Sequence, residues 1–170
     1  MGDAAEITAH VRSLRRYALQ LTRSRDAADD LVQECLARAL ANASTLKPGL
    51  PVRPWLFRIL HNLHVSEQRK LRLRRATLLD PAEERVPASQ DERLELRAVL
   101  DAVARLPDDQ RSVLHLVAVE GMSYQEASRI LEIPIGTLMS RLARGRETLR
   151  RSLQQPRAAR LQVVGGCDAR

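Results

Sequence analysis

The residues from Ser123 to Arg146 carry the pattern that most narrows the folds open to this chain: a short helix, a turn and a second, arginine-rich helix. Ser123, with Glu126 three residues later, forms a capping box, in which two side chains satisfy the amide donors that begin a helix. Pro134 then interrupts the run, because proline has no amide donor and clashes with the preceding helical turn. The order of these signals predicts a helix-turn-helix, which docks one of its helices in the major groove of DNA.

The second helix of this pattern has two chemically different faces. At about 100° per residue its polar side presents Thr137, Ser140 and Arg144, with Arg141 on the edge. Arginine can donate two hydrogen bonds to a guanine in the major groove, which makes this side a candidate base-reading surface. An ordinary amphipathic helix pair with a solvated face is the alternative, but the capping box, the turn and the basic side occur together. The opposite stripe is apolar and consists of Ile135, Leu138, Leu142, Gly145 and Leu149.

The composition predicts an all-α protein whose core is filled by leucine, alanine and valine, since only four of its 170 residues are aromatic. A net charge of +7 favours a polyanionic partner, although charge alone does not separate nucleic acid from an anionic membrane. No stretch approaches the roughly 18 apolar residues of a membrane-spanning helix, and the N-terminus lacks a signal-peptide core. We therefore expect no membrane insertion and a cytoplasmic protein.

The chain shows no sign of catalysis, and we expect neither an enzyme nor a cofactor. Its four histidines lack the spacing of metal ligands, and no serine or cysteine has a recognisable base. Cys35 falls on an apolar stripe, where cysteine packs as a small core residue. Cys167 has no evident partner, so neither a metal site nor a disulfide is predicted.

Charge and proline content divide the chain into four segments. Residues 1–75 are basic, with 14 Lys/Arg against 7 Asp/Glu. Residues 76–91 contain two prolines and no helical stripe, which is typical of a linker. We therefore expect two small helical domains, residues 1–75 and 92–153, joined by a flexible linker and followed by a disordered tail over 154–170. Such a linker spans up to roughly 53 Å, so the domains could sit more than one turn of duplex apart.

An acidic patch in the basic first domain is a further sign of a partner. An apolar stripe predicts a helix over residues 26–43, and Asp30, Gln33 and Glu34 lie on the other side of that helix. The helix dipole accounts for acids in the first turn, but it accounts less well for Glu34, about two turns in. We therefore expect this patch to dock a basic partner.

A proline-rich loop precedes the next helix, and a basic run ends that helix. The run places five basic residues within seven, from Arg69 and Lys70 to Arg75, and such a run attracts phosphate. Trp55 and Phe57, beside the loop, are either core residues or a surface on which unstacked bases stack. The loop itself contains Lys47, Pro48, Gly49, Leu50 and Pro51.

Several short motifs occur in a fixed order along the chain. In the first domain these are residues 29–34 (DDLVQE) and 54–62 (PWLFRILHN). In the second they are residues 106–111 (LPDDQR), 120–127 (EGMSYQEA) and 134–142 (PIGTLMSRL). Together they resemble the signatures of domains 2 and 4 of the sigma-70 family of bacterial transcription initiation factors, specifically its small extracytoplasmic-function (ECF) group.

The resemblance implies a role for each candidate surface. Domain 2 of the family binds the clamp helices of core RNA polymerase and the −10 promoter element, and domain 4 binds the polymerase flap and reads the −35 element. An anti-sigma factor is the implied regulator. The implied polymerase-facing residues are Asp30, Gln33 and Glu34. The implied −10 residues are Lys47, Pro48, Gly49, Leu50, Pro51, Arg58, Asn62, Arg69 and Lys70. The implied −35 residues are Thr137, Ser140, Arg141 and Arg144.

Two rival functions stay open. A sigma-like decoy would bind an anti-sigma factor and not DNA, but such mimics should lose the basic groups of the recognition helix, and this chain keeps them. A plain helix-turn-helix regulator would bind duplex DNA alone, but it leaves the acidic patch and the proline-rich loop of the first domain unexplained.

Overall fold

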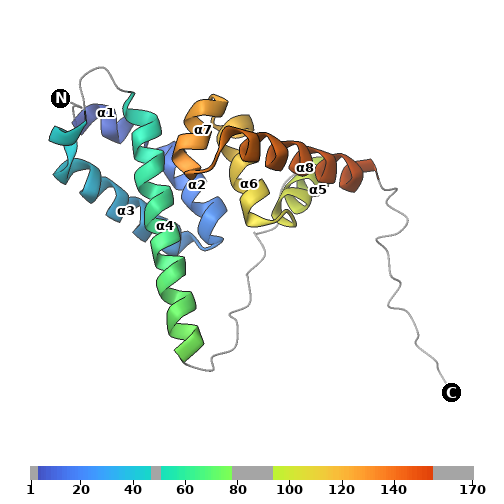
Figure 1. Ribbon diagram of the computed structural model, residues 1–170, viewed down its shortest axis with the longest axis horizontal. Coiled ribbons are helices and arrows are strands. Elements are labelled where there is room, and N and C mark those ends of the chain that lie inside the picture. Colours follow the sequence, from blue (N-terminus) through green and yellow to red (C-terminus); the bar gives the residue numbers. More distant parts are fainter. Residues whose placement is uncertain (1–3, 47–50, 78–93, 155–170) are drawn as a thin grey trace.

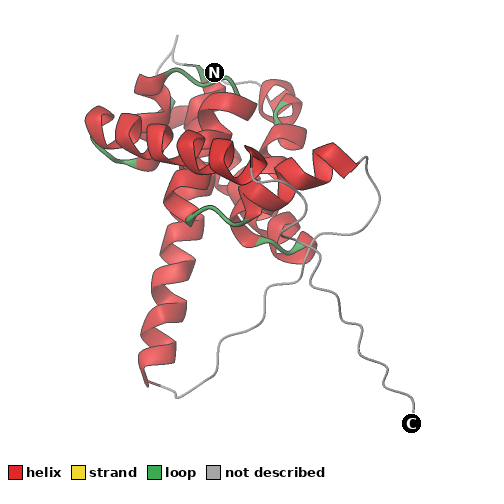
Figure 2. Ribbon diagram, turned by 90° about the vertical axis from the view of Figure 1, so that its right-hand side faces the viewer, coloured by secondary structure: helices red, strands yellow, loops and turns green. Residues whose placement is uncertain are grey.

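The computed structural model describes residues 4–46, 51–77 and 94–154, and the regular structure of this part of the chain is helical (Figure 1, Figure 2). The all-α prediction is confirmed. The N-terminal domain, as described, contains α1 (Ala4–Ala9), α2 (Val11–Thr22), α3 (Arg25–Ala41), the short 3-10 turn η1 (Ala43–Thr45) and α4 (Val52–Thr77). The C-terminal domain contains α5 (Leu94–Ala104), α6 (Asp108–Leu114), the π-helical turn η2 (His115–Val119), α7 (Tyr124–Leu131) and α8 (Ile135–Gln154).

The N-terminal domain packs α2, α3 and α4 around one apolar core. The fully buried rings of Tyr17 and Phe57 stack with their centroids 5.4 Å apart. Cys35 is fully buried as predicted, and its thiol donates to the carbonyl oxygen of Leu56 at 3.5 Å. Burial raises the pKa of this thiol to about 12, so Cys35 is a neutral core residue.

Helix α4 is 26 residues long, and its second half projects beyond the other helices in both views (Figure 1, Figure 2). Leu73 in this half is 73% exposed, which is the consequence of that projection. The helix ends at Thr77, two residues into the segment expected as a linker. The rest of that segment lies outside the described residues, as does the expected tail beyond Gln154.

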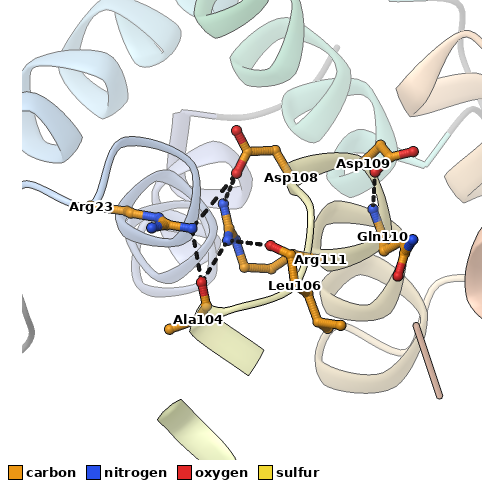
Figure 3. Close-up of polar contacts among 7 residues, drawn as sticks. All are labelled: Arg23, Ala104, Leu106, Asp108, Asp109, Gln110 and Arg111. Atoms are coloured by element: carbon orange, nitrogen blue, oxygen red, sulfur yellow. Dashed lines mark hydrogen bonds and ion pairs between the residues drawn. The ribbon is translucent and has the colours of Figure 1, made fainter. Parts of the chain in front are cut away.

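A buried arginine organises the turn between α5 and α6 (Figure 3). The guanidinium of Arg111 donates to the carbonyl oxygens of Ala104, at 3.2 Å, and Leu106, at 3.0 Å, and it pairs with Asp108. Because a guanidinium stays charged at all ordinary pH values, it is tolerated in the interior only with such acceptors around it. This is the structural role of the arginine in the LPDDQR motif.

The close approach of α8 to α6 depends on a glycine. A Cβ atom built on Gly145 would lie 2.7 Å from Cδ1 of Leu114, so a larger residue does not fit without a shift. Leu138 and Leu142, on the same stripe of α8, are buried as predicted. Ile135, at the start of the helix, is 45% exposed, because the stripe leaves the core there.

The two domains pack against each other. Helix α4 contacts α7, helix α2 contacts α6, and buried apolar side chains of both domains form one continuous cluster. The sequence allowed the domains to sit far apart on DNA. The structure brings them together, and this arrangement decides what the candidate DNA-binding residues touch.

Candidate nucleic-acid interface

The helix-turn-helix is present where the sequence predicts it. The hydroxyl of Ser123 accepts from the amide of Glu126 at 3.2 Å, and the Glu126 carboxylate accepts from the amide of Ser123 at 2.8 Å, which completes the capping box. Gly121, just before it, has a φ of 65°, a conformation that glycine adopts without strain. Helix α7 ends at Leu131, and its C-cap residue Glu132 is also in the left-handed region with a φ of 53°; α8 begins three residues after Glu132.

The predicted recognition face of α8 consists of Thr137, Ser140, Arg141 and Arg144. The Ser140 hydroxyl donates to the carbonyl oxygen of Thr137 at 2.9 Å. Arg144 is exposed, and its guanidinium folds back toward the carbonyl and hydroxyl oxygens of Ser140, both at 3.4 Å. Bonds this long and exposed are weak, so the Arg144 side chain is available to a partner in the groove.

Arg141 differs from the rest of the recognition face. Its Nε lies 3.2 Å from a carboxylate oxygen of Asp109 on α6, and its side chain is only 30% exposed. This ion pair anchors α8 to α6. A base contact by Arg141 would therefore have to compete with the Asp109 carboxylate, whereas Arg144 bonds to the neutral oxygens of Ser140.

The −10 candidates on α4 fall into two groups. Arg58 and Asn62 lie on the half of the helix that packs in the body, and both reach toward Glu132 of the C-terminal domain. Arg69 and Lys70 are exposed on the projecting half. Among the loop candidates, Pro51 is exposed, while Lys47, Pro48, Gly49 and Leu50 lie outside the described residues.

The two aromatic residues beside the loop have different environments. Phe57 is fully buried, so it is a core residue. Trp55 is half-buried and lines a hollow of about 330 Å³ between α3 and α4. Asn62 lines the same hollow, which is therefore polar as well as aromatic. The remaining lining residues are Arg38, Asn42, Ile59, Leu63 and Ser66.

The acidic patch on α3 is exposed as expected. Asp30, Gln33 and Glu34 all lie on the solvent side of the helix, opposite the buried Val32 and Cys35. Glu34 pairs with Arg38 one turn later at 2.7 Å. Because exposed pairs of this kind are weak, the carboxylate is accessible to a basic partner.

Sequence reasoning missed two acidic residues of the C-terminal domain, Glu120 and Glu132. Glu132 accepts from Asn62 at 3.1 Å and from Arg58 at 3.3 Å. The Glu120 carboxylate forms ion pairs with two arginines of the N-terminal domain, Arg16 at 2.8 Å and Arg53 at 2.7 Å. Helical periodicity identifies which face of a helix is buried, but it does not identify a partner in another domain. The one signal in the sequence was the basic charge of the first domain, which favours acidic partners.

Glu120 is the centre of a buried polar cluster between the domains. Its side chain has no exposed surface, and His115 approaches the same carboxylate at 3.2 Å. Burial opposes ionisation of Glu120, but the hydrogen bonds from Arg16 and Arg53 outweigh it and lower the pKa of the carboxyl below its usual value. The ring of His115 in turn contacts Tyr17 of α2, with centroids 5.3 Å apart.

A metal site and a membrane-spanning helix each place requirements on the part of the chain that the structure describes. No three of its histidine, cysteine, aspartate and glutamate residues gather as a metal site would require. None of its described helices combines the length and the apolar character that crossing a membrane would need.

Comparison with known families matches both domains. The model for "Sigma2 domain of PhyR" matches residues 7–61, and the model for "Sigma-70, region 4" matches residues 96–149. The chain is 43% identical over 150 residues to the ECF RNA polymerase sigma factor EcfG of Rhodopseudomonas palustris, covering 85% of this chain and 81% of that protein. It is 32% identical over 151 residues to the ECF RNA polymerase sigma factor SigL of Mycobacterium tuberculosis, covering 86% and 85%.

Solved structures give the same result. The sigma factor RpoE of Bartonella quintana, in complex with the anti-sigma factor NepR, superposes with a TM-score of 0.79 at 32% identity, over 90% of this chain and 97% of that chain. CnrH, in complex with the cytosolic domain of CnrY, gives 0.61 at 28% identity, over 86% and 84%. The PhyRSL–NepR complex of Sphingomonas sp. Fr1 gives 0.67 at 21% identity, over 96% and 94%, and this shows a shared fold.

Proposed function

Because this chain belongs to the extracytoplasmic-function group of RNA polymerase sigma factors, we propose that its two helical domains divide promoter recognition between them. Factors of this group bind core RNA polymerase and direct initiation at selected promoters. In the proposal, residues 1–75 are sigma domain 2 and residues 92–153 are sigma domain 4. The chain acts beside core polymerase in the cytoplasm, and no catalytic step is assigned to it.

One observation carries the −35 part of the proposal: the capped helix-turn-helix leaves Thr137, Ser140 and Arg144 on the face of α8 opposite its buried residues. A helix presented in this way fits the major groove, where its polar side chains reach base edges. Arg144 is the proposed base-reading residue. Arg141 has a smaller share, since its guanidinium is held by Asp109.

The −10 element is proposed to lie along α4 and the loop before it. Arg58 and Asn62 would contact the DNA beside the hollow that Trp55 lines, and a flipped base needs an aromatic surface of this kind. Arg69 and Lys70, on the projecting half of α4, would neutralise phosphates further along. The loop residues Lys47 to Pro51 complete the proposed base pocket.

Core polymerase is proposed to bind the exposed acidic patch on α3. Asp30, Gln33 and Glu34 share one solvent face there, in a domain that is otherwise basic. This contrast favours a basic surface on the partner, because complementary charge steers association and orients the two proteins.

An anti-sigma factor is the proposed regulator. RpoE of Bartonella quintana is solved with the anti-sigma factor NepR, and CnrH is solved with CnrY. We propose that a protein of that kind covers faces of this chain that polymerase needs.

A sigma-like decoy is the second candidate, since the model that matches the first domain is that of the Sigma2 domain of PhyR. A decoy would bind an anti-sigma factor without supporting transcription. The basic residues on α8 argue for the sigma factor, because a decoy has no use for them.

In-vitro transcription separates the two candidates. Core polymerase is supplied with genomic promoter fragments, with and without the purified chain. We expect promoter-specific transcripts only when the chain is present, and their loss with the Asp30→Lys/Glu34→Lys variant. Absence of transcripts together with tight binding to an anti-sigma factor would establish the decoy.

A further inference from the structure

The polar contacts between the two domains share one pattern of charge. At three places a basic or amide side chain of the N-terminal domain meets an oxygen acceptor of the C-terminal domain. The first place is Glu132, which faces α4, the second is Glu120, which faces α2 and α4, and the third is the turn between α5 and α6, which faces α2. The C-terminal domain thus offers oxygens to the same basic domain that is proposed to hold promoter DNA.

The contact at Glu132 involves the proposed −10 residues directly. One oxygen of its carboxylate accepts from Asn62 at 3.1 Å and from Arg58 at 3.3 Å. A carboxylate and a phosphate present similar anionic oxygens to a guanidinium. While the domains are in this arrangement, Glu132 therefore occupies donors that DNA would require.

The contact at Glu120 is the stronger link. The carboxylate has no exposed surface, and it lies between Arg16 of α2 and Arg53 of α4. A buried carboxylate needs such partners, because an uncompensated charge in the interior is unfavourable. The ring of His115 packs on Tyr17 beside it, so apolar contact supports the ion pairs.

The third contact is at the turn between α5 and α6 (Figure 3). Arg23, just after α2, donates to the carbonyl oxygen of Ala104 at 3.0 Å and lies 3.7 Å from the Asp108 carboxylate. The carbonyl of Ala104 also accepts from Arg111. The turn that Arg111 organises is thus also a docking point for the N-terminal domain.

We propose that the C-terminal domain is an internal competitor for promoter DNA: Glu132 masks Arg58 and Asn62, and the buried Glu120 cluster holds the mask in place. The inference rests on the proposed −10 role of those two residues. Exposed pairs such as Arg58–Glu132 contribute little on their own, so the closed state depends on Glu120. In this proposal, polymerase separates the two domains when it binds the chain, and the −10 surface then becomes exposed.

The test removes both interface carboxylates from the full-length chain with the double variant Glu120→Gln/Glu132→Gln. The matched control is Glu6→Gln/Glu147→Gln, which removes the same charge from exposed α1 and from a carboxylate paired within α8. Small-angle X-ray scattering measures the radius of gyration. Fluorescence anisotropy measures the Kd for a labelled single-stranded oligonucleotide of random sequence at fixed ionic strength.

We expect the interface variant to have a larger radius of gyration than the wild type and to bind the oligonucleotide about fivefold more tightly than the control, the size of a modest coupling between two sites. The control should keep the wild-type radius. Identical radii and equal affinities for wild type, control and interface variant would overturn the proposal.

Glu120 also contacts His115 within its own domain, so a second variant approaches the same contact from the other side. Arg16→Gln removes one of the two arginines without changing the C-terminal domain. We expect the same expansion, with the helical circular dichroism of the wild type. Arg16→Gln with an unchanged radius would count against the proposal even if the double variant misfolds. Transcription with core polymerase tests the proposed function separately, because sigma activity does not require the free chain to be closed.

Discussion

The carboxylate of Glu132 lies 3.1 Å from the side-chain nitrogen of Asn62, a residue 70 positions earlier in the chain. Glu132 is the left-handed C-cap residue that follows α7, so it lies in the turn of the helix-turn-helix. Asn62 is on α4, beside the hollow that Trp55 lines. The turn before the predicted recognition helix therefore touches the helix proposed to hold the −10 element, and the two proposed DNA-binding regions are in physical contact.

Alanine substitutions at two glycines of α8 should change the free energy of unfolding in opposite directions. We expect Gly145→Ala to lower the free energy of unfolding by about 1–2 kcal/mol, because its Cβ would lie 2.7 Å from the buried Leu114. Gly136→Ala is the matched control. Nothing lies within 4 Å of its Cβ, and alanine favours helix, so it should raise the free energy of unfolding by up to about 1 kcal/mol.

Urea denaturation of both variants, followed by circular dichroism, measures the two changes. If the two variants have the same free energy of unfolding, Leu114 moves aside without a loss of stability. The close packing of α8 on α6 would then not require a glycine at position 145.

The helix-turn-helix was predictable because its signals are local. The capping box at Ser123 and the buried Leu138 and Leu142 follow from spacing alone, and each has the position that the sequence indicates. Cys35 was predictable for the same reason. Periodicity identifies which side of a helix is buried, and these residues need nothing more.

The contacts between domains were not predictable in this way. Arg16, Arg53 and Arg58 belong to polar faces, and a polar face is ordinarily assigned to solvent. Their partners, Glu120 and Glu132, are distant in sequence and lie beside the turns that flank α7. No spacing rule joins residues of two domains, so the closed arrangement becomes visible only in three dimensions.

Charge reversal on α3 should separate docking from folding. We expect the double variant Asp30→Lys/Glu34→Lys to weaken binding to core polymerase at least about tenfold, since two favourable charges become two repulsive ones. Both residues are exposed, so the thermal unfolding midpoint should stay close to that of the wild type. Co-purification with core polymerase and differential scanning calorimetry measure the two effects.

The matched control reverses another exposed acid, Glu6→Lys, on α1. It should leave polymerase binding unchanged. Equal loss of binding in both variants would mean that net charge matters and that the α3 patch does not.

Acid should destabilise the chain through His61. Burial is the main cause that lowers the pKa of His61 to about 4; nearby His64 lowers it further, and Glu132 opposes the shift. An unfolded histidine titrates near 6.5, so between pH 6.5 and about 4 the unfolded chain binds a proton that the folded chain does not. The free energy of unfolding therefore falls as the pH falls through this window, by up to about 3 kcal/mol from this residue.

Urea midpoints measured across this pH range test the expectation. His61→Gln should flatten part of the pH dependence, although it loses the hydrogen bond with the Tyr17 hydroxyl at every pH. His10→Gln, in the bend between α1 and α2, is the control and should retain the wild-type slope. A His61→Gln profile as steep as that of the wild type would show that other groups cause the acid sensitivity.

The sharpest prediction at a single residue concerns base reading by Arg144. This side chain is exposed on the recognition face and bonds only weakly to Ser140, so we expect it to contact a guanine. Arg144→Ala should then cost roughly 1–3 kcal/mol and relax selection at one position of the −35 element. A library of promoters with randomised −35 sequences, transcribed with the variant, measures both effects.

Arg150 is the comparison on the same helix. It lies nearly two turns beyond Arg144, and its guanidinium donates two hydrogen bonds to the Glu147 carboxylate, at 3.0 and 3.1 Å. Arg150→Ala should therefore weaken all promoters about equally, as the loss of a phosphate contact would, and leave base preference intact. If Arg144→Ala also lowers every promoter uniformly, Arg144 contacts the DNA backbone alone. Base reading would then belong to Thr137 and Ser140, because Arg141 would first have to leave Asp109.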